Sequence, residues 1–170
     1  SFLSFSEQTI SINGFSKFFA MTGWRLGYMI TPKEWMSAAD RMHQNLMISA
    51  TEFVQEAGIS VLQKSKVYCE KMKAEFNRRR IFVLKRMREL GMDPGYTPTG
   101  AFYVFYKYPD SSKSSLDLCH EVLEKTGVAI APGLDFGAMG EGYIRLSYAQ
   151  SMENIDRALT KLADSKLLTS

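Results

Sequence analysis

The spacing of apolar residues changes several times along this 170-residue chain, and each change predicts a different element. Alternating apolar and polar residues over 8–12 predict a strand. Apolar residues at helical spacing then predict a short helix that ends near His43. The stretch Thr31-Pro-Lys-Glu34 is typical of a capping box with proline at the first helical position. Ser49-Ala-Thr-Glu52 is a second predicted capping box, and a long apolar stripe follows it.

This stripe continues for about forty residues, which is too long for one ordinary globular helix. We therefore predict a break near residues 64–66 and a second helix that stops at Gly91. Asp93-Pro-Gly95 then predicts a hinge. Because a helix of this kind can bridge two domains, the predicted parts are residues 1–64, an interdomain helix and hinge at 65–94, and a C-terminal domain at 95–170.

The pattern changes again after the hinge. Aromatic and β-branched content predicts strands at 101–106, 128–131 and 143–147. A helix is expected to begin at Ser114 or Ser115 and to end at Gly127, and a closing helix begins near Ser151. This order predicts a small α+β domain with its helices on one face of a mixed sheet.

Composition places the chain among ordinary globular proteins, with 45% hydrophobic and 23% charged residues. It contains no apolar run of about eighteen residues and no secretory signal pattern, so we expect a cytoplasmic protein without a membrane span. Cys69 and Cys119 fall at core-like helical positions, which predicts buried thiols and no disulfide. His43 and His120 are too far apart in sequence to predict a metal site.

Basic residues gather between Lys64 and Arg88, where ten lysines and arginines stand against Glu70 and Glu75. An excess of this kind is found on nucleic-acid-binding surfaces. We interpret it as the solvated polar face of an amphipathic helix, because the net charge is only +3 and no nucleic-acid motif accompanies it. No nucleic-acid partner is predicted.

Lys17 is the first candidate for chemistry, within the run Ser11-Ile-Asn-Gly-Phe-Ser-Lys-Phe-Phe-Ala-Met-Thr-Gly-Trp-Arg-Leu-Gly-Tyr28. A lysine that is desolvated or beside another cation loses its proton readily and can attack a carbonyl carbon. Arg25 could supply that charge, and its planar fork of donors matches a phosphate. Ser16 adds a hydroxyl beside the lysine. Surface charges flanking an apolar segment are the alternative, but the joint pattern is far more specific than such a pair.

The run 11–28 resembles the cofactor-lysine motif of class I/II (fold type I) pyridoxal phosphate aminotransferases. The resemblance implies that Lys17 is the catalytic residue and holds pyridoxal 5'-phosphate as a Schiff base. It also implies that Ser16 and Arg25 bind the cofactor phosphate. The family often has a further serine three places before the lysine, where this chain has Gly14. That variant is associated with the bacterial and archaeal aspartate-aminotransferase-like branch.

A second stretch resembles the small-domain signature of the same family. It consists of Gly127-Val-Ala-Ile-Ala-Pro-Gly133, Phe136-Gly137 and Gly142-Tyr-Ile-Arg-Leu-Ser-Tyr148. The resemblance implies that Arg145 clamps the α-carboxylate of the substrate. A guanidinium fork suits a planar carboxylate, and fixing that group orients the Cα–H bond for cleavage. The alternative is a strand arginine that points to solvent.

The resemblance covers nearly all of the chain and corresponds to the C-terminal part of an α/β enzyme with the PLP-dependent transferase fold. It implies a remnant of a large α/β/α domain, joined by a long helix to a small α+β domain. The implied activity is amino transfer between an amino acid and a 2-oxo acid. The implied assembly is a homodimer with active sites at the subunit interface, partly lined by residues 43–49.

Specificity for dicarboxylates stays open, since no arginine lies between His43 and Asn77 while Arg41 is close. Another fold-type-I activity, such as a carbon–sulfur lyase or a cyclopropane-forming synthase, would share the lysine and both arginines. The remaining alternatives are an inactive fragment and the ligand-sensing module of an aminotransferase-like regulator.

Overall fold

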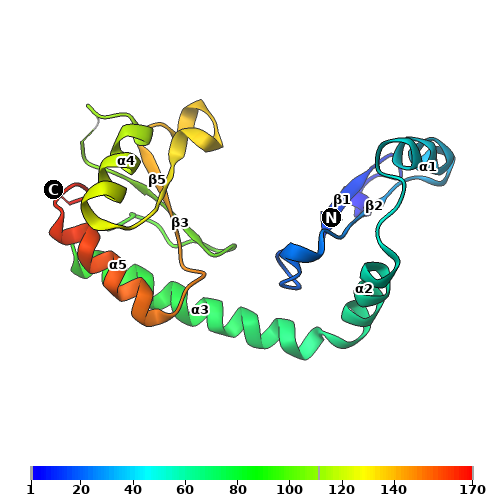
Figure 1. The fold of residues 1–170 in the computed structure, drawn as a ribbon, viewed down its shortest axis with the longest axis horizontal. Helices are drawn as coiled ribbons and strands as arrows, with labels where there is room; N and C mark the ends of the chain where they lie inside the picture. Colours follow the sequence, from blue (N-terminus) through cyan, green and yellow to red (C-terminus); the bar gives the residue numbers. More distant parts are fainter. Residues whose placement is uncertain (1, 111, 170) are drawn as a thin grey trace. The chain divides into compact units, whose positions relative to one another are not determined.

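The computed structural model describes residues 2–110 and 112–169. Contacts within the chain divide it into two compact units, residues 1–72 and residues 73–170. The helices are α1 (Lys33–Met47), α2 (Glu52–Lys64), α3 (Lys66–Glu89), α4 (Ser115–Thr126) and α5 (Met152–Asp164) (Figure 1). The strands are β1 (Ser11–Gly14), β2 (Gly27–Ile30), β3 (Tyr103–Lys107), β4 (Ala131–Pro132) and β5 (Tyr143–Ser147). The predicted three-part division stays a prediction.

The first unit contains a two-stranded hairpin. Strands β1 and β2 pair antiparallel, with Ser11 opposite Ile30 and Gly14 opposite Gly27. The first strand begins at Ser11 rather than at Gln8, whose backbone N–H donates to the Ser6 hydroxyl instead (3.1 Å). Because the strands end opposite each other, residues 15–26 form a long connection whose two ends meet.

The predicted capping boxes at the starts of α1 and α2 are wrong. The N-cap of α1 is Pro32, whose ψ of 146° is extended, so the helix begins one residue later than predicted. The Thr31 hydroxyl is buried and has no hydrogen-bond partner in the part of the chain that the structure describes. The N-cap of α2 is Thr51 without a side-chain bond, and the Ser49 hydroxyl donates to the Ala50 carbonyl (2.8 Å). Helix α1 also extends to Met47, beyond its predicted end.

The predicted division of the long apolar stripe is confirmed. Helix α2 ends at Lys64 and α3 begins at Lys66, with Ser65 between them. Gly91 follows α3 with a φ of +77°, a conformation that glycine adopts at low cost and that ends a helix.

The second unit is built on a three-stranded sheet with the order β3-β5-β4. Both strand pairs are antiparallel, so the prediction of a mixed sheet is wrong. Strand β5 has the predicted bounds. Strand β4 is shorter than predicted and begins at Ala131, because only Ala131 and Pro132 pair with β5, opposite Arg145 and Ile144.

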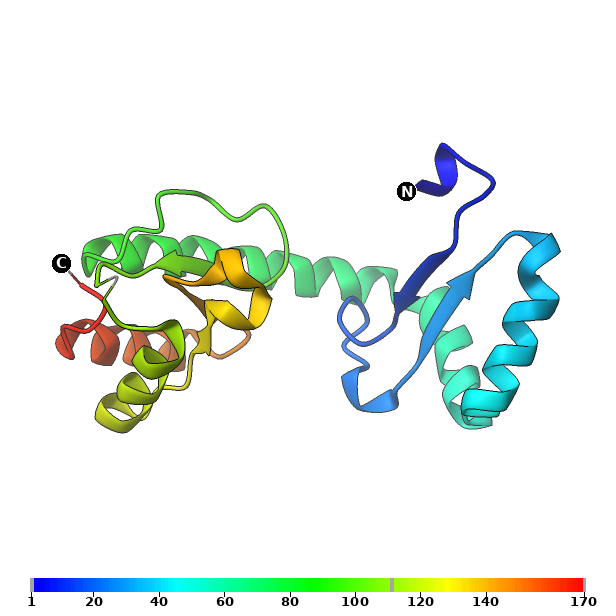
Figure 2. The same ribbon diagram turned by 90° about the horizontal axis from the view of Figure 1, so that it is seen from above.

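One face of this sheet is covered by helices, as predicted. Helix α5 lies beside the C-terminal half of α3 (Figures 1 and 2), and the Arg86 guanidinium of α3 donates to the Asp156 carboxylate of α5 (2.6 Å). The buried cluster on this face includes Val83, Leu84 and Met87 from α3, Val104 and Tyr106 from β3, Leu118, Cys119 and Val122 from α4, Ile144 and Leu146 from β5, and Ile155, Leu159 and Leu162 from α5. Neighbouring residues of a strand point to opposite faces of the sheet. The strand residues that alternate with these buried ones therefore lie on the other face.

The ends of α4 and α5 follow the sequence signals. The Ser114 hydroxyl accepts from the Asp117 backbone N–H (3.1 Å), and the Ser151 hydroxyl accepts from the Asn154 N–H (3.2 Å). Gly127 ends α4 in the left-handed conformation, with a φ of +69°. These bonds satisfy N–H groups that a helix leaves unpaired, and the predicted caps are confirmed.

Candidate active site

Three of the predicted site residues lie in the connection between β1 and β2. Ser16 and Lys17 lie in a turn after β1, and Arg25 follows a short 3-10 helix at Thr22–Trp24. The Phe15 backbone N–H donates to the Leu26 carbonyl (3.0 Å), which closes this connection at its base. We call residues 15–26 the lysine loop.

Thr22 links the two halves of the lysine loop. Its hydroxyl donates to the Ser16 carbonyl (2.9 Å), and its own carbonyl accepts from Nη1 of Arg25 (3.1 Å). The hydroxyl residue and the guanidinium residue are therefore joined through one threonine. No sequence pattern singles out Thr22, because its role depends on the folded path of the loop.

Two residues of the lysine loop have left-handed backbone. Ala20 has a φ of +55° and Arg25 a φ of +53°. For residues other than glycine, this conformation costs roughly 1–2 kcal/mol each, and such strain is concentrated at functional sites. The surrounding hydrogen bonds hold the loop in this conformation.

Helices α2 and α3 anchor the lysine loop from behind. A Cβ added at Gly58 of α2 would lie 2.6 Å from Cδ2 of Leu26 and 3.6 Å from the Phe15 ring, so the helix approaches the loop closely. The Cys69 thiol of α3 donates to the Phe18 carbonyl (3.6 Å). Sequence reasoning missed Gly58, although a glycine inside a predicted helix is itself a signal of close packing.

Arg145 lies on β5, on the face of the sheet opposite the buried cluster. Its Cζ atom is 4.2 Å from the centre of the Tyr103 ring and 4.3 Å from the centre of the Phe136 ring. Two aromatic rings thus cover the guanidinium, an arrangement that stabilises the cation through the ring quadrupoles. Sequence reasoning missed both rings as partners of the arginine.

The N–H donors of Arg145 make no hydrogen bond or ion pair with residues 2–110 or 112–169. The side chain is half-buried rather than pointing freely to solvent. A guanidinium has five N–H donors and no acceptor, and its preferred ligands are planar or phosphate oxyanions. This arrangement can bind an oxyanion ligand without first breaking an internal ion pair.

A turn between β4 and β5 carries Phe136, and two glycines fix its shape. A Cβ at Gly133 would lie 2.0 Å from the Gly140 carbonyl oxygen, and a Cβ at Gly140 would lie 2.1 Å from the Gly133 oxygen. Neither position has room for a side chain. Between them stand the short 3-10 helices Gly133–Phe136 and Ala138–Gly140.

A carboxylate network ties the same turn to α4. Glu141 accepts from the Ser115 backbone N–H (2.6 Å), the Ser115 hydroxyl (3.0 Å) and the Tyr108 hydroxyl (3.1 Å). The Ser115 N–H bond holds the pKa of Glu141 below its ordinary value. Burial, and then the bond to Glu141, raises the pKa of Tyr108 to about 12. At neutral pH the carboxylate is therefore an acceptor and the tyrosine a donor.

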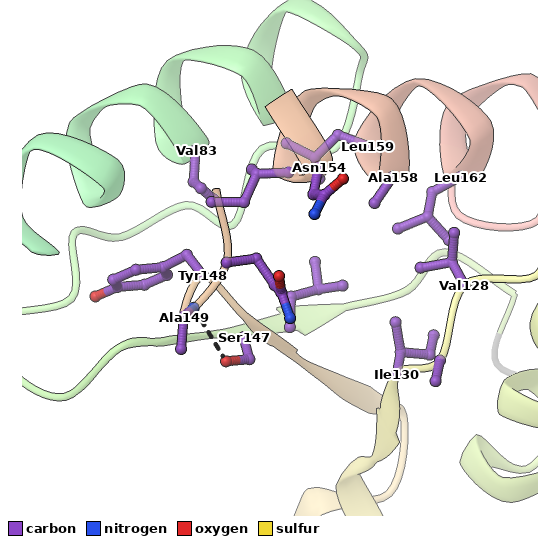
Figure 3. A pocket seen from close by; sticks show the side chains of 14 residues that line it. Val83, Val128, Ile130, Ser147, Tyr148, Ala149, Asn154, Ala158, Leu159 and Leu162 are labelled. Carbon is purple, nitrogen blue, oxygen red and sulfur yellow. Dashed lines mark hydrogen bonds between the residues drawn. The ribbon is translucent and has the colours of Figure 1, made fainter. Parts of the chain in front are cut away.

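A hollow near the sheet of the second unit does not contain the predicted site residues. It measures about 300 Å³ and lies between the end of β5 and α5, where Tyr148, Asn154 and Leu159 line it (Figure 3). Its lining is mostly apolar and continuous with the buried cluster. Chemistry at Lys17, Arg25 or Arg145 cannot take place there.

The two cysteines are both buried, as predicted. Burial raises the pKa of the Cys119 thiol to about 11, which makes it a poor nucleophile. Within the described ranges, no group of three or more histidine, cysteine, aspartate or glutamate residues could hold a metal ion. Among the same residues, none of the helices is long and apolar enough to cross a membrane.

Comparison with known proteins places these features in a family. The family described as aminotransferase class I and II matches residues 1–162 of the chain. The chain belongs to this family. Members of the aminotransferase class I and II family are generally pyridoxal phosphate-dependent and commonly dimeric.

Individual aminotransferases resemble the chain closely. The aspartate aminotransferase of Pyrococcus horikoshii is 40% identical over 158 residues, which are 92% of this chain and 40% of that protein. The aromatic-amino-acid aminotransferase 2 of Thermococcus litoralis is 40% identical over 161 residues, again 92% of this chain and 40% of that protein. The chain thus spans about two fifths of the length of these curated relatives.

Solved aminotransferase structures share the fold. The aromatic aminotransferase from Pyrococcus horikoshii has a TM-score of 0.86 at 36% identity, over 95% of this chain and 44% of that chain. An aminotransferase from Mycobacterium tuberculosis has a TM-score of 0.87 at 34% identity, over 96% of this chain and 43% of that chain. The predicted α/β transferase fold is confirmed. The lysine loop and Arg145 lie in different units of the chain, so their convergence on one ligand stays a prediction.

Proposed function

We propose that the protein transfers an amino group between an α-amino acid and a 2-oxo acid with pyridoxal phosphate as cofactor. Membership of the aminotransferase family supports the reaction class. The observation that carries the proposal is Arg145, a half-buried guanidinium between two rings whose donors have no acceptor among the described residues. An α-carboxylate is common to both substrates and would supply that acceptor.

The residues of the lysine loop fit the proposed cofactor. A phosphate needs a cation and neutral donors, and Arg25 and Ser16 supply both from one loop braced by Thr22. Lys17 supplies an amine beside them. Pyridoxal phosphate, when bound, supplies an aldehyde and a ring that withdraws electrons from the substrate Cα.

Each residue would then have one task. Arg25 and Ser16 would bind the phosphate and fix the cofactor, so that the Lys17 amine is near the aldehyde. Arg145 would bind the substrate carboxylate and so fix the direction of the Cα–H bond. Nζ of Lys17, acting as a general base, would accept the proton from Cα and return it in the following step.

The substrate class is proposed more broadly than one amino acid. Relatives at the same level of identity carry different printed names, aspartate in one case and aromatic amino acid in the other. These names favour transamination over a lyase, a synthase or a regulatory module. The cytoplasmic location expected from the sequence stays a prediction.

The proposal is tested by adding pyridoxal phosphate to the purified protein and recording visible absorption. We expect a band that L-aspartate or L-phenylalanine bleaches. Borohydride reduction should place the cofactor mass on Lys17, as peptide mass spectrometry reports. Lys17→Ala should lose the mass label, whereas Lys33→Ala, which changes an exposed lysine of α1, should keep it. The proposal would be overturned if the protein forms no such band, or if none of the common amino acids bleaches the band.

We also propose that the protein acts as a homodimer in which the first unit forms part of the interface. Helix α1 has no buried side chain, and Met42, Leu46 and Met47 on it are exposed. Ile48 follows with φ +64° and ψ −78°, a strained conformation for a β-branched residue. Exposed apolar surface of this extent is typical of an interaction site.

Sedimentation velocity tests the homodimer. We expect a dimer for the wild-type protein and a shift toward monomer in Leu46→Arg. Met139→Arg adds the same charge at a fully exposed methionine of the second unit and should stay dimeric. A wild-type protein that sediments as a monomer at micromolar concentration would contradict this assembly.

A further inference from the structure

Arg145 is held by an aromatic cluster that covers one face of the sheet. Tyr103 of β3 and Phe136 stand on its guanidinium. Behind them, Phe105 meets the Phe136 ring edge-on, with ring centres 5.8 Å apart, and stacks on Tyr143 at 5.1 Å. The Tyr103 ring has its own neighbour, the Phe102 ring, with ring centres 4.5 Å apart. Each ring that touches the arginine is therefore packed against another ring.

Two rings within 4.3 Å of the Arg145 Cζ atom restrict how a ligand can approach the guanidinium. The N–H donors all lie in the guanidinium plane, so a carboxylate that binds them approaches the edge of the group, away from the rings. The rings also reduce the number of rotamers that the arginine samples before the ligand arrives. Less conformational entropy is then lost on binding, which strengthens the bound state.

Phe136 depends on contacts outside its own turn, whereas Tyr103 is fixed by strand pairing opposite Ser147. The Leu134 backbone N–H, two residues before Phe136, donates to the Ser115 hydroxyl (3.3 Å). That hydroxyl in turn donates to the Glu141 carboxylate (3.0 Å). Ser115 is fully buried, so the Ser115 end of this chain of bonds is shielded from water, whereas Glu141 is exposed.

We propose that Tyr103 and Phe136 act as an aromatic clamp that positions Arg145 for edge-on binding of a carboxylate, and that Glu141 keeps Phe136 in the clamp through Ser115. This inference rests on the proposed function, because the carboxylate is that of the substrate. Tyr103, Phe136 and Glu141 are positioning residues, since they act through Arg145. The clamp adds to the affinity for the carboxylate and leaves proton transfer at Lys17 unchanged.

The first test compares matched variants of the clamp. Phe136→Leu keeps an apolar side chain but removes the ring, and Phe136→Tyr keeps a ring at a position that is 48% exposed. Losing one cation–π contact should raise the dissociation constant of a carboxylate ligand by about 3- to 30-fold. Phe136→Tyr should stay within about 2-fold of wild type by the same scale. Tyr103→Leu and Tyr103→Phe form a second pair with the same expectation.

Calorimetry with 3-phenylpropanoate, which has a carboxylate but no amine, measures this constant without turnover. In parallel, KM for L-phenylalanine should rise while kcat stays close to wild type. Equal affinity in wild type and Phe136→Leu would overturn the clamp. A Phe136→Tyr protein that binds the carboxylate as weakly as Phe136→Leu would also overturn it, because restoring the ring would then not restore the affinity.

The second test concerns Glu141. Glu141→Ala removes the carboxylate that accepts from Ser115 and Tyr108, whereas Glu141→Gln keeps one oxygen for the Ser115 N–H. We expect weaker 3-phenylpropanoate binding in Glu141→Ala and substantial recovery in Glu141→Gln. Unfolding midpoints of both variants separate loss of the fold from loss of the clamp, and the Phe136 pair stays decisive if Glu141→Ala does not fold.

The outcomes distinguish this inference from the proposed function. If the wild-type protein forms no cofactor band and converts no amino acid, the proposed function fails whatever the variants do. If the wild-type protein transaminates and its KM is insensitive to Phe136→Leu and Tyr103→Leu, only the clamp is wrong.

Discussion

The two units differ most in how much apolar surface each one covers with its own residues. The second unit buries seventeen hydrophobic side chains in one cluster, whereas the first unit buries only Phe15, Met21, Val54 and Cys69. Of the twenty-eight large hydrophobic side chains that are exposed among the described residues, twenty-one belong to the first unit. The second unit is therefore organised around its own core, and the first unit presents surface suited to further contacts.

The candidate chemistry is divided in the same way. Arg145 is held by rings on a sheet whose other face is fully packed. The lysine loop is held by a few backbone bonds, Thr22, and its contacts with α2 and α3. A site residue on a packed element is positioned before any ligand binds, whereas residues on a strained loop gain order from the ligand and from partner surfaces.

The largest effect is expected at the lysine loop. Lys17→Ala should slow amino transfer by at least about 10²- to 10⁴-fold, because it removes the proposed general base and the attachment point of the cofactor. Single-turnover kinetics with L-aspartate or L-phenylalanine measure this rate. The thermal unfolding midpoint should hardly change, since Lys17 is exposed. Activity in Lys17→Ala close to that of Lys33→Ala would separate the loop from the chemistry.

A matched pair of leucines tests the contrast in packing directly. Leu162 in the second unit is 0% exposed and Leu62 in the first unit is 62% exposed. Leu162→Ala should lower the free energy of unfolding by about 2–5 kcal/mol, because it leaves a cavity in a packed core. Leu62→Ala should change it by about 0.5 kcal/mol or less. Urea unfolding gives both values, and an equal loss in Leu62→Ala would mean that another surface covers α2.

The turn between β4 and β5 offers a smaller effect. Gly140→Ala places a methyl group 2.1 Å from the Gly133 carbonyl oxygen, so the backbone must move apart. Overpacking of this kind should cost about 1–3 kcal/mol. Gly100→Ala is the matched control, because a Cβ there meets no atom within 4 Å. Unfolding free energies that fall equally in the two variants would contradict the close approach.

The smallest effect is expected from an exposed ion-pair group on α3. Hydrogen bonds from Arg78, and then from Arg79, lower the pKa of Glu75 from 4.5 to about 2. A lowered pKa in the folded state adds stability above pH 4.5, and this contribution is lost as the pH falls toward 2. Glu75→Gln should therefore lose less stability across this window than the wild-type protein does.

Urea unfolding between about pH 6 and about pH 2.5 measures how the free energy of unfolding depends on pH. This range covers most of the interval between the two pKa values of the Glu75 carboxyl, 4.5 when unpaired and about 2 when paired. Glu124→Gln is the control, since Glu124 is exposed and makes no ion pair among the described residues. Identical slopes for Glu75→Gln and Glu124→Gln would show that the Glu75 pairs do not contribute.

Sequence patterns predicted those elements whose signals are local. Each helix end at Ser114, Gly127 and Ser151 depends on residues at most four positions apart. The local sequence is therefore enough to predict these ends. The capping boxes at Thr31 and Ser49 were wrong for an equally local reason. Extended backbone at the residue before each helix moved the helix start past the predicted hydroxyl.

The rest depended on contacts between residues far apart in sequence. The sheet is antiparallel because β5 lies between β3 and β4, which no single stretch specifies. Lys17, Arg25 and Arg145 could be singled out from motifs, but their supports could not. Glu141 reaches Ser115 across 26 positions, and Cys69 reaches Phe18 across 51. Spacing rules for helices and strands do not extend over such separations.

The glycine pair at 133 and 140 has a consequence for attempts to redesign substrate preference. Both positions must stay glycine, because the backbone of each one occupies the space that a side chain on the other would need. The positions between the two glycines tolerate substitution more easily, since Leu134 is 47% exposed and Met139 is 93% exposed. A mutant library that randomises 134, 138 and 139 and keeps both glycines would vary the turn that carries Phe136, a ring in contact with Arg145, with few unfolded members.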